Sequence, residues 1–141
     1  MENRIKIVYL SAPYSSDLKA EQEGRYNDLL ELQGILLEAG VNCVNPLANT
    51  VPAAKYMKNM NLGYDDYLKN DLVILDRCDE LLVLALPGWT RSEGVKKEIA
   101  FALARQLPVT VIEKDEMYKL PNVISGVSLG KSISQLFAIE C

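Results

Sequence analysis

Short apolar runs alternate along this chain with longer segments in which apolar residues recur at helical spacing. The runs cover residues 5–10, 41–44, 81–86 and 109–112. Each predicts a strand, because apolar runs of this length bounded by polar, Gly or Pro residues are typical of strands. The run 81–86 is apolar without interruption, which is typical of a strand buried on both faces of a parallel sheet.

The segments between the runs predict helices, since their apolar positions repeat every three to four residues. These helices cover residues 18–39, 64–77, the stretch between Thr90 and Pro108, and 129–139, with a short helix beginning at Pro52. Thr90 and Glu93 have the spacing of a capping box, and Gly40 is placed to end the first helix. Residues 113–121 are a predicted loop, and a fifth short strand is expected within 122–127.

The alternation of strands and helices predicts an α/β fold with a parallel sheet covered on both sides. Right-handed crossovers make this a doubly wound, flavodoxin-like sheet of about five strands in a single domain over residues 1–141. Ligands of such sheets bind at the carboxyl ends of the strands. The loops 11–17 and 87–92 occupy that position after the first strand and after the run 81–86.

Composition excludes several classes of protein. The net charge is −4 and no basic block occurs, which argues against a nucleic acid polymer or an anionic membrane as partner. No apolar run approaches the roughly 18 residues of a membrane span. The first residues lead directly into a strand without a signal-peptide pattern, and three cysteines are scattered, so we expect a cytoplasmic protein.

The absence of histidine restricts the chemistry most. It removes Ser-His and Cys-His nucleophile pairs and His-based metal sites, and the cysteines lack metal-ligand spacing. No G-x-G-x-x-G follows the first strand and no Walker A pattern occurs, so dehydrogenase, kinase and NTPase activities lose their main support. Catalysis would therefore depend on carboxylates, Tyr and Ser.

Four polar residues from three elements are candidates for that chemistry. Glu98 is a candidate nucleophile or base, although a solvated helix glutamate is the ordinary alternative. Asp71 could equally be a partly exposed aspartate, Tyr9 a core residue, and Ser92 a residue at a helix end. In a doubly wound fold all four could meet at one sheet edge. Paired carboxylates without histidine are typical of glycosidic-bond cleavage.

A single tryptophan, Trp89, lies on the loop 87–92. It could stack on a flat ligand such as a base, an interaction worth roughly 1–3 kcal/mol. The alternative is that its ring covers the core.

Three segments resemble the nucleoside 2-deoxyribosyltransferase-like superfamily, and most closely its small, largely uncharacterised bacterial and phage branch. They are residues 9–15, which read Tyr-Leu-Ser-Ala-Pro-Tyr-Ser, residues 71–79, and residues 87–98. The specific part is a Ser–x–Gly–x–x–x–Glu motif formed by Ser92, Gly94 and Glu98. The resemblance covers nearly the whole chain and is weakest over residues 50–61 and after 113.

The resemblance implies a Rossmann-like sheet, assembly into at least dimers, and catalysis without a cofactor. It implies that Glu98 is the nucleophile and forms a covalent deoxyribosyl or ribosyl intermediate. Tyr9 would hold that carboxylate, and Asp71 would serve the leaving base. Ser92 would contact the sugar or its 5′ substituent.

The loop after the first strand departs from the family. Family hydrolases of nucleoside monophosphates carry Ser and Arg there, whereas this loop has no Arg. We expect Ser11, Tyr14 and Gly94 to bind substrate and Arg25 to supply the missing charge. Glu93 would repel a phosphate, which leaves the recognised 5′ group open.

These observations predict an enzyme that cleaves the N-glycosidic bond of a nucleoside or nucleoside 5′-monophosphate. Hydrolysis is favoured over base exchange, because the loop 87–92 is short and few aromatic residues are available to close a pocket around a second base. The alternatives are a deoxyribosyltransferase, a nucleotide-sensing module without turnover, and an NAD-cleaving enzyme. Tyr- and Met-rich segments at 56–60 and 64–67 support the expectation of a homodimer or larger assembly.

Overall fold

A parallel sheet forms the middle layer of the molecule. The computed structural model describes residues 5–58, 62–122 and 131–132. The strand order is β2-β1-β3-β4-β5. The strands are β1 (Val8–Ser11), β2 (Cys43–Val44), β3 (Glu80–Leu84), β4 (Val109–Ile112) and β5 (Lys131–Ser132). The first four are parallel to one another, and β3 lies between β1 and β4, so the predicted doubly wound sheet is confirmed.

The parallel sheet has four strands, whereas about five were predicted. The fifth strand, β5, pairs antiparallel with β4. Its two residues fall inside the predicted helix 129–139, where pairing with the free edge of β4 overrides local helical periodicity. The rest of that helix, and the strand expected within 122–127 apart from Asn122, lie outside the described residues.

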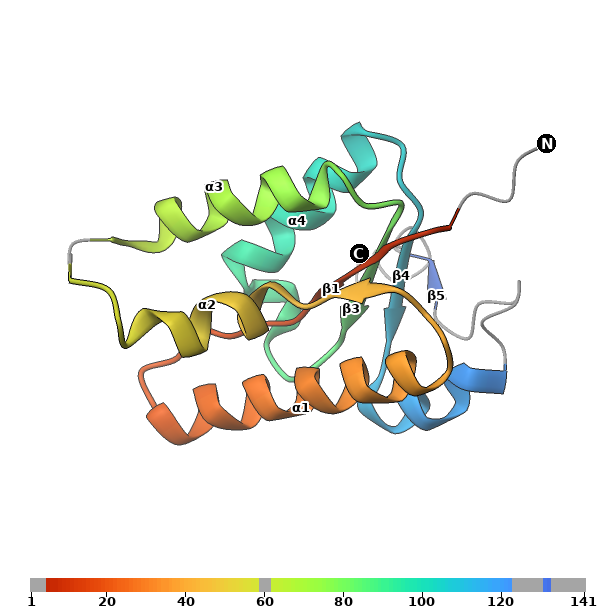
Figure 1. The fold of residues 1–141 in the computed structure, drawn as a ribbon, viewed down its shortest axis with the longest axis horizontal. Coiled ribbons are helices and arrows are strands. Elements are labelled where there is room, and N and C mark those ends of the chain that lie inside the picture. Colours follow the sequence, from red (N-terminus) through yellow and green to blue (C-terminus); the bar gives the residue numbers. More distant parts are fainter. Residues whose placement is uncertain (1–4, 59–61, 123–130, 133–141) are drawn as a thin grey trace.

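Helices cover both faces of the sheet (Figure 1). They are α1 (Lys19–Glu38), α2 (Pro46–Ala54), α3 (Tyr64–Leu75) and α4 (Glu93–Ala104), with two 3-10 helices, η1 (Trp89–Arg91) and η2 (Lys114–Asn122). Figure 1 shows α3 and α4 on one side of the sheet and α1 on the other. Over the described ranges, no helix combines the length and apolar character needed to cross a bilayer.

The central strand β3 divides the core into two parts. Because successive strand residues face opposite sides, Leu81 and Val83 join one buried cluster, while Leu82 and Leu84 join another. The first cluster also contains residues of α3 and α4, and the second contains the apolar side of α1 and residues of η2. The uninterrupted apolar run in the sequence therefore reflects a strand covered on both faces, as predicted.

The N-terminus of α4 differs from the one predicted. The α4 helix is capped by Ser92, whose side chain accepts from the Val95 amide at 3.3 Å. Thr90 lies inside η1, so the predicted Thr90–Glu93 capping box is wrong. The 3-10 helix η1 lies between β3 and α4 and ends one residue before the cap, Ser92.

The second helix begins at Pro46 and not at Pro52, which lies inside it. Residues 114–122 form η2, although a loop was predicted there. Gly40 does follow the end of α1, with a φ of 83° that suits glycine.

Asn45 gives a test of this local structure. Its buried side chain caps α2 by accepting from the amides of Leu47 at 3.0 Å and Ala48 at 3.3 Å. We expect Asn45→Ala to lower the free energy of unfolding by about 1–2 kcal/mol in urea titrations, since it removes an N-cap. Asn49→Ala, on the exposed side of the same helix, should be neutral or slightly stabilising. An equal loss in both variants would contradict the capping role.

Candidate active site

A cavity of about 830 Å³ opens at the carboxyl ends of β1 and β3. The crossover after β1 leads towards β2, and that after β3 leads towards β4, so the cavity lies at the switch point of the strand order. Seven of the residues proposed from the sequence line it: Ser11, Tyr14, Arg25, Asp71, Ser92, Gly94 and Glu98. Both loops expected to form the site therefore contribute to its wall.

Glu98 is buried, with 7% of its surface exposed. Its Oε2 accepts a hydrogen bond from the Tyr9 hydroxyl at 2.5 Å, and its Oε1 accepts one from Ser11 Oγ at 2.6 Å. Tyr9 and Ser11 are two residues apart on β1, so their side chains point to the same face of the sheet, where α4 packs. The alternative of a solvated surface glutamate is therefore wrong.

The local sequence of α4 explains why a carboxylate is buried there. Val95, Ile99 and Ala102 form the apolar side of the helix and pack in the cluster under α3 and α4. Glu98 lies three residues after Val95 and four before Ala102, so it faces the same way. Packing of the apolar side therefore carries Glu98 into the protein, against the two hydroxyls of β1.

Burial dominates the electrostatics of Glu98. Burial and, to a lesser extent, the charge of Asp71 raise the pKa of the carboxyl, while the hydrogen bonds from Ser11 and Tyr9 lower it, so that the pKa is about 7. The pKa of Tyr9 is raised, first by burial and then by the neighbouring Glu98 charge, so its hydroxyl keeps its proton and donates. Near neutral pH, Glu98 is thus close to the midpoint of its titration.

Asp71 lies on α3 and faces the same cavity. Burial raises its pKa to about 6, although a hydrogen bond with Asn70 lowers it. Within the described part of the chain, no group hydrogen-bonds to its inaccessible Oδ1 atom. A buried polar atom without a partner is unusual in a folded protein. Asp71 therefore combines a place in the cavity wall with an acceptor atom that its described surroundings leave without a donor.

Trp89 occupies a different position from the one expected. It packs against the cluster under α3 and α4 and does not belong to the cavity lining found among the described residues. The expectation that it stacks on a ligand in this cavity is therefore corrected: η1 turns the ring towards the core. Aromatic walls are supplied instead by Tyr14, Tyr64 and Tyr67.

Arg91 is a cavity residue that the sequence analysis did not single out. It belongs to the loop 87–92 and is exposed, and the described structure gives it no ion pair. Arg25, the expected source of positive charge, instead donates to backbone carbonyls. The sequence feature that could have identified Arg91 is its position between Trp89 and Ser92, in a loop already expected to form the site.

Gly94 lies in the cavity wall, next to Tyr64 and Ser92. A Cβ atom there would lie 3.9 Å from the Tyr64 ring and 4.0 Å from Ser92 Oγ, at ordinary contact distances.

Considering the described residues alone, no three Cys, Asp or Glu side chains are grouped so that they could hold a metal ion.

The comparisons with known proteins agree with this architecture. The model of the family described as "Domain of unknown function (DUF1937)" matches residues 6–114. Among solved structures, the chain is similar to the 2-deoxyribosyltransferase of the psychrotolerant bacterium Bacillus psychrosaccharolyticus, with a TM-score of 0.55 and 15% identity. That match covers 76% of this chain and 72% of the other, and it establishes similarity of fold. No curated protein matches the chain.

The raised pKa of Glu98 predicts an unusual pH dependence of stability. Below its ordinary pKa near 4.5 the carboxyl is protonated in both the folded and the unfolded chain. As the pH rises towards about 7, the unfolded chain releases the proton while the folded chain still holds it, so folding loses stability. The difference in free energy of unfolding between wild type and Glu98→Gln should therefore shift by about 3 kcal/mol in favour of the variant between about pH 4.5 and pH 8.

Urea titrations of both proteins across that range would check it. Ser11→Ala should extend the window to higher pH, because it removes a hydrogen bond that lowers the pKa of Glu98. A pH-independent difference between wild type and Glu98→Gln would contradict the burial of an ionisable carboxyl.

Proposed function

The chain belongs to the DUF1937 family, and we propose that it cleaves the N-glycosidic bond of a nucleoside or nucleoside 5′-monophosphate, with Glu98 as nucleophile. The observation that carries this proposal is the buried Glu98 carboxylate, held by two hydroxyl donors at a cavity that it shares with Asp71. Paired carboxyl groups of this kind suit attack on a sugar carbon with protonation of the leaving group.

Glu98 has the properties that covalent attack requires. The bonds from Tyr9 and Ser11 fix both oxygens, so the carboxylate is already oriented before substrate arrives. A carboxylate lone pair would form a bond to the anomeric carbon as the bond from that carbon to the base breaks. The resulting glycosyl ester is then released by water or by another acceptor.

Asp71 is proposed to serve the departing base. Its pKa of about 6 allows a fraction of the molecules to carry a proton near neutral pH, and the residue lines the cavity. A protonated carboxyl can deliver that proton to the leaving nitrogen. The two carboxyls would then have different roles, attack and protonation, in one cavity.

The lining of the cavity suits a flat base joined to a polar group. Tyr14, Tyr64 and Tyr67 provide aromatic surface, while Ser92 and Arg91 provide a hydroxyl and a positive charge. Arginine is well suited to phosphate, so Arg91 would favour a monophosphate if the substrate carries one. Glu93 also lines the cavity, but its carboxylate is paired with Lys96 at 3.1 Å.

We propose hydrolysis as the main activity. Transfer requires a second base to be held while water is kept from the ester. Trp89, the largest candidate for holding such a base, lies against the core. Base exchange is the second candidate, favoured by the position of Tyr14 in the cavity wall.

Assembly into a homodimer or larger is part of the proposal. Leu62 and Tyr64 line the cavity and are exposed, and Tyr56 is exposed on the same connection between α2 and α3. Exposed apolar side chains beside a site are typical of surfaces that another chain covers.

Replacement of the nucleophile tests the proposal. We expect Glu98→Gln to lower turnover at least about a hundredfold, because an amide oxygen cannot replace the attacking carboxylate. Release of free base from nucleosides and 5′-monophosphates, followed by chromatography, measures this. Glu38→Gln makes the same change on the exposed end of α1 and should retain wild-type turnover. Wild-type activity in Glu98→Gln would refute the assignment.

The acceptor is tested separately. Wild-type protein is incubated with an active substrate in the presence and absence of a different free base. We expect free sugar or sugar phosphate to form at similar rates in both, since water reaches the ester directly. Accumulation of a new nucleoside, with only slow sugar release when no base is added, would establish transfer instead.

A further inference from the structure

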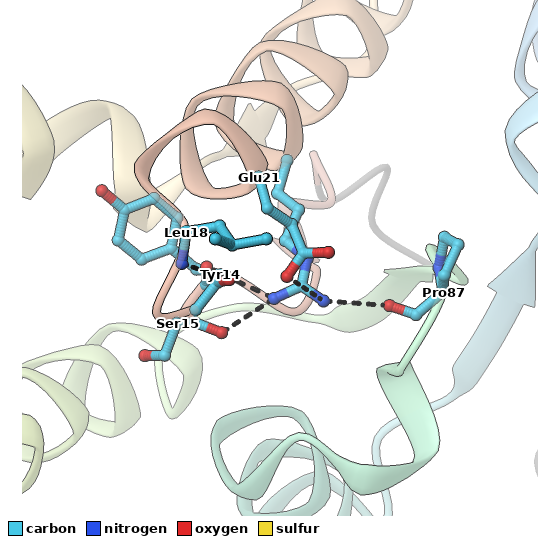
Figure 2. Close-up of polar contacts among 7 residues, drawn as sticks. Tyr14, Ser15, Leu18, Glu21 and Pro87 are labelled. Atoms are coloured by element: carbon cyan, nitrogen blue, oxygen red, sulfur yellow. Dashed lines mark hydrogen bonds and ion pairs between the residues drawn. The ribbon is translucent and has the colours of Figure 1, made fainter.

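The guanidinium of Arg25 joins two loops that are far apart in the sequence (Figure 2). Its Nη1 donates to the carbonyl oxygens of Ser15 at 2.8 Å and Tyr14 at 3.5 Å, both in the loop after β1. Its Nη2 donates to the carbonyl oxygen of Pro87 at 3.1 Å, in the loop after β3. One side chain on the first helix therefore bonds to both loops at the switch point.

The guanidinium is held firmly in this position. Glu21, one turn earlier on α1, lies 3.5 Å from Nη2, and the Arg25 side chain is only 15% exposed. Hydrogen bonds from a charged donor are stronger than those between neutral groups, and more so away from water. The bonds to Ser15 and Pro87, at 2.8 and 3.1 Å, are the shorter two and reach one carbonyl in each loop.

Backbone hydrogen bonds do not connect the loops directly within the described structure, although Ala12 and Leu86 pack in the same apolar cluster. Each contains a proline, Pro13 or Pro87, which cannot donate a backbone hydrogen bond. Among the backbone hydrogen bonds of the described residues, none runs directly from the loop after β1 to the loop after β3.

Gly88 allows the guanidinium to approach the second loop. Its φ of 89° is one that favours glycine, and a Cβ atom there would lie 3.4 Å from Arg25 Nη2. The guanidinium therefore lies directly against the turn that begins the second loop.

Both loops lead to the groups of the candidate site. The first begins after Ser11, which donates to Glu98, and carries Tyr14 in the cavity wall. The second carries Gly88 and leads through η1 to Ser92, the N-cap of the helix that bears Glu98. Tyr14 of the first loop and Gly88 of the second both line the cavity, so the loops that Arg25 joins form part of its wall.

We propose that Arg25 is a positioning residue, which clamps the two loops and holds the cavity walls at the separation that the reaction requires. This inference rests on the proposed function for its catalytic consequence, whereas the clamp itself is a statement about the loops. The planar guanidinium is essential, because a lysine ammonium is a compact charge without a fixed fork of donors. Glu21 orients the guanidinium, and its loss should matter less.

The test compares four variants: Arg25→Ala, Arg25→Lys, Glu21→Gln, and Arg105→Ala as the matched control. Arg105 is a half-exposed arginine, paired with Asp76 at 2.9 Å and absent from the cavity lining found in the described structure. We expect kcat for base release to fall about tenfold to a hundredfold in Arg25→Ala, because small displacements of reacting groups have effects of this order. Arg25→Lys should fall nearly as far, whereas Glu21→Gln should lose less than about threefold and Arg105→Ala should be unchanged.

Chemical rescue separates positioning from general destabilisation. Added methylguanidinium should restore a measurable part of kcat in Arg25→Ala, and should do nothing for Arg25→Lys, in which a side chain occupies the space. Wild-type kinetics in Arg25→Ala would overturn the proposal. A loss explained by the unfolded fraction, without rescue, would overturn it as well.

The single tryptophan provides a readout that does not depend on activity. Trp89 follows Gly88 on the clamped loop, so quenching of its fluorescence by acrylamide reports how well that loop is held. We expect more quenching in folded Arg25→Ala and Arg25→Lys, reversal by methylguanidinium in the former only, and no change in Arg105→Ala. Unchanged quenching in both Arg25 variants would overturn the clamp. If the wild type releases no base while quenching behaves as expected, the proposed function fails and the clamp stands. Nucleoside binding, measured by calorimetry, then tests the positioning role. Unweakened binding in Arg25→Ala would overturn that role.

Discussion

The hydrogen bonds from Tyr9 and Ser11 to Glu98 are the interaction on which this site depends. A carboxylate removed from water and left without donors would be several kcal/mol less stable, and it would bind a proton instead. The two hydroxyls offset part of that penalty, yet burial still raises the pKa of Glu98 to about 7. The protein thus retains a group that opposes its own stability, which is typical of residues kept for function.

The sheet provides the constraint that brings these groups together. Tyr9 and Ser11 are on β1, while Glu98 is on the helix that follows β3, and β1 and β3 are neighbours in parallel register. Because α4 must pack its apolar side on this pair of strands, Glu98 is carried to the same place as the hydroxyls. Asp71 arrives on α3, which packs beside α4 on the same face (Figure 1).

The fold and the candidate site support the proposed function in different ways. The similarity to a solved 2-deoxyribosyltransferase, at 15% identity, concerns the arrangement of strands and helices. The proposed chemistry depends instead on the two carboxyls in one cavity and on the donors that orient Glu98. Arg25 adds a third feature, since its guanidinium bonds to a carbonyl in the loop after β1 and to one in the loop after β3.

The sequence by itself determined the parallel sheet and the candidates for chemistry. The apolar run at β3 required a strand buried on both faces, and the absence of histidine directed attention to Glu98, Asp71 and Tyr9. The parallel sheet is confirmed, because strand periodicity is a local property that the sequence displays; the catalytic roles stay predictions.

Only the tertiary structure decided where the side chains lie. It buried Glu98, turned Trp89 to the core, engaged Arg25 with three carbonyls and placed Arg91 in the cavity wall. It also made the last described strand antiparallel, because the free edge of β4 offered a partner that no local pattern reveals. Each of these outcomes depends on contacts between residues distant in the chain, whose energies exceed the local preferences that a sequence displays.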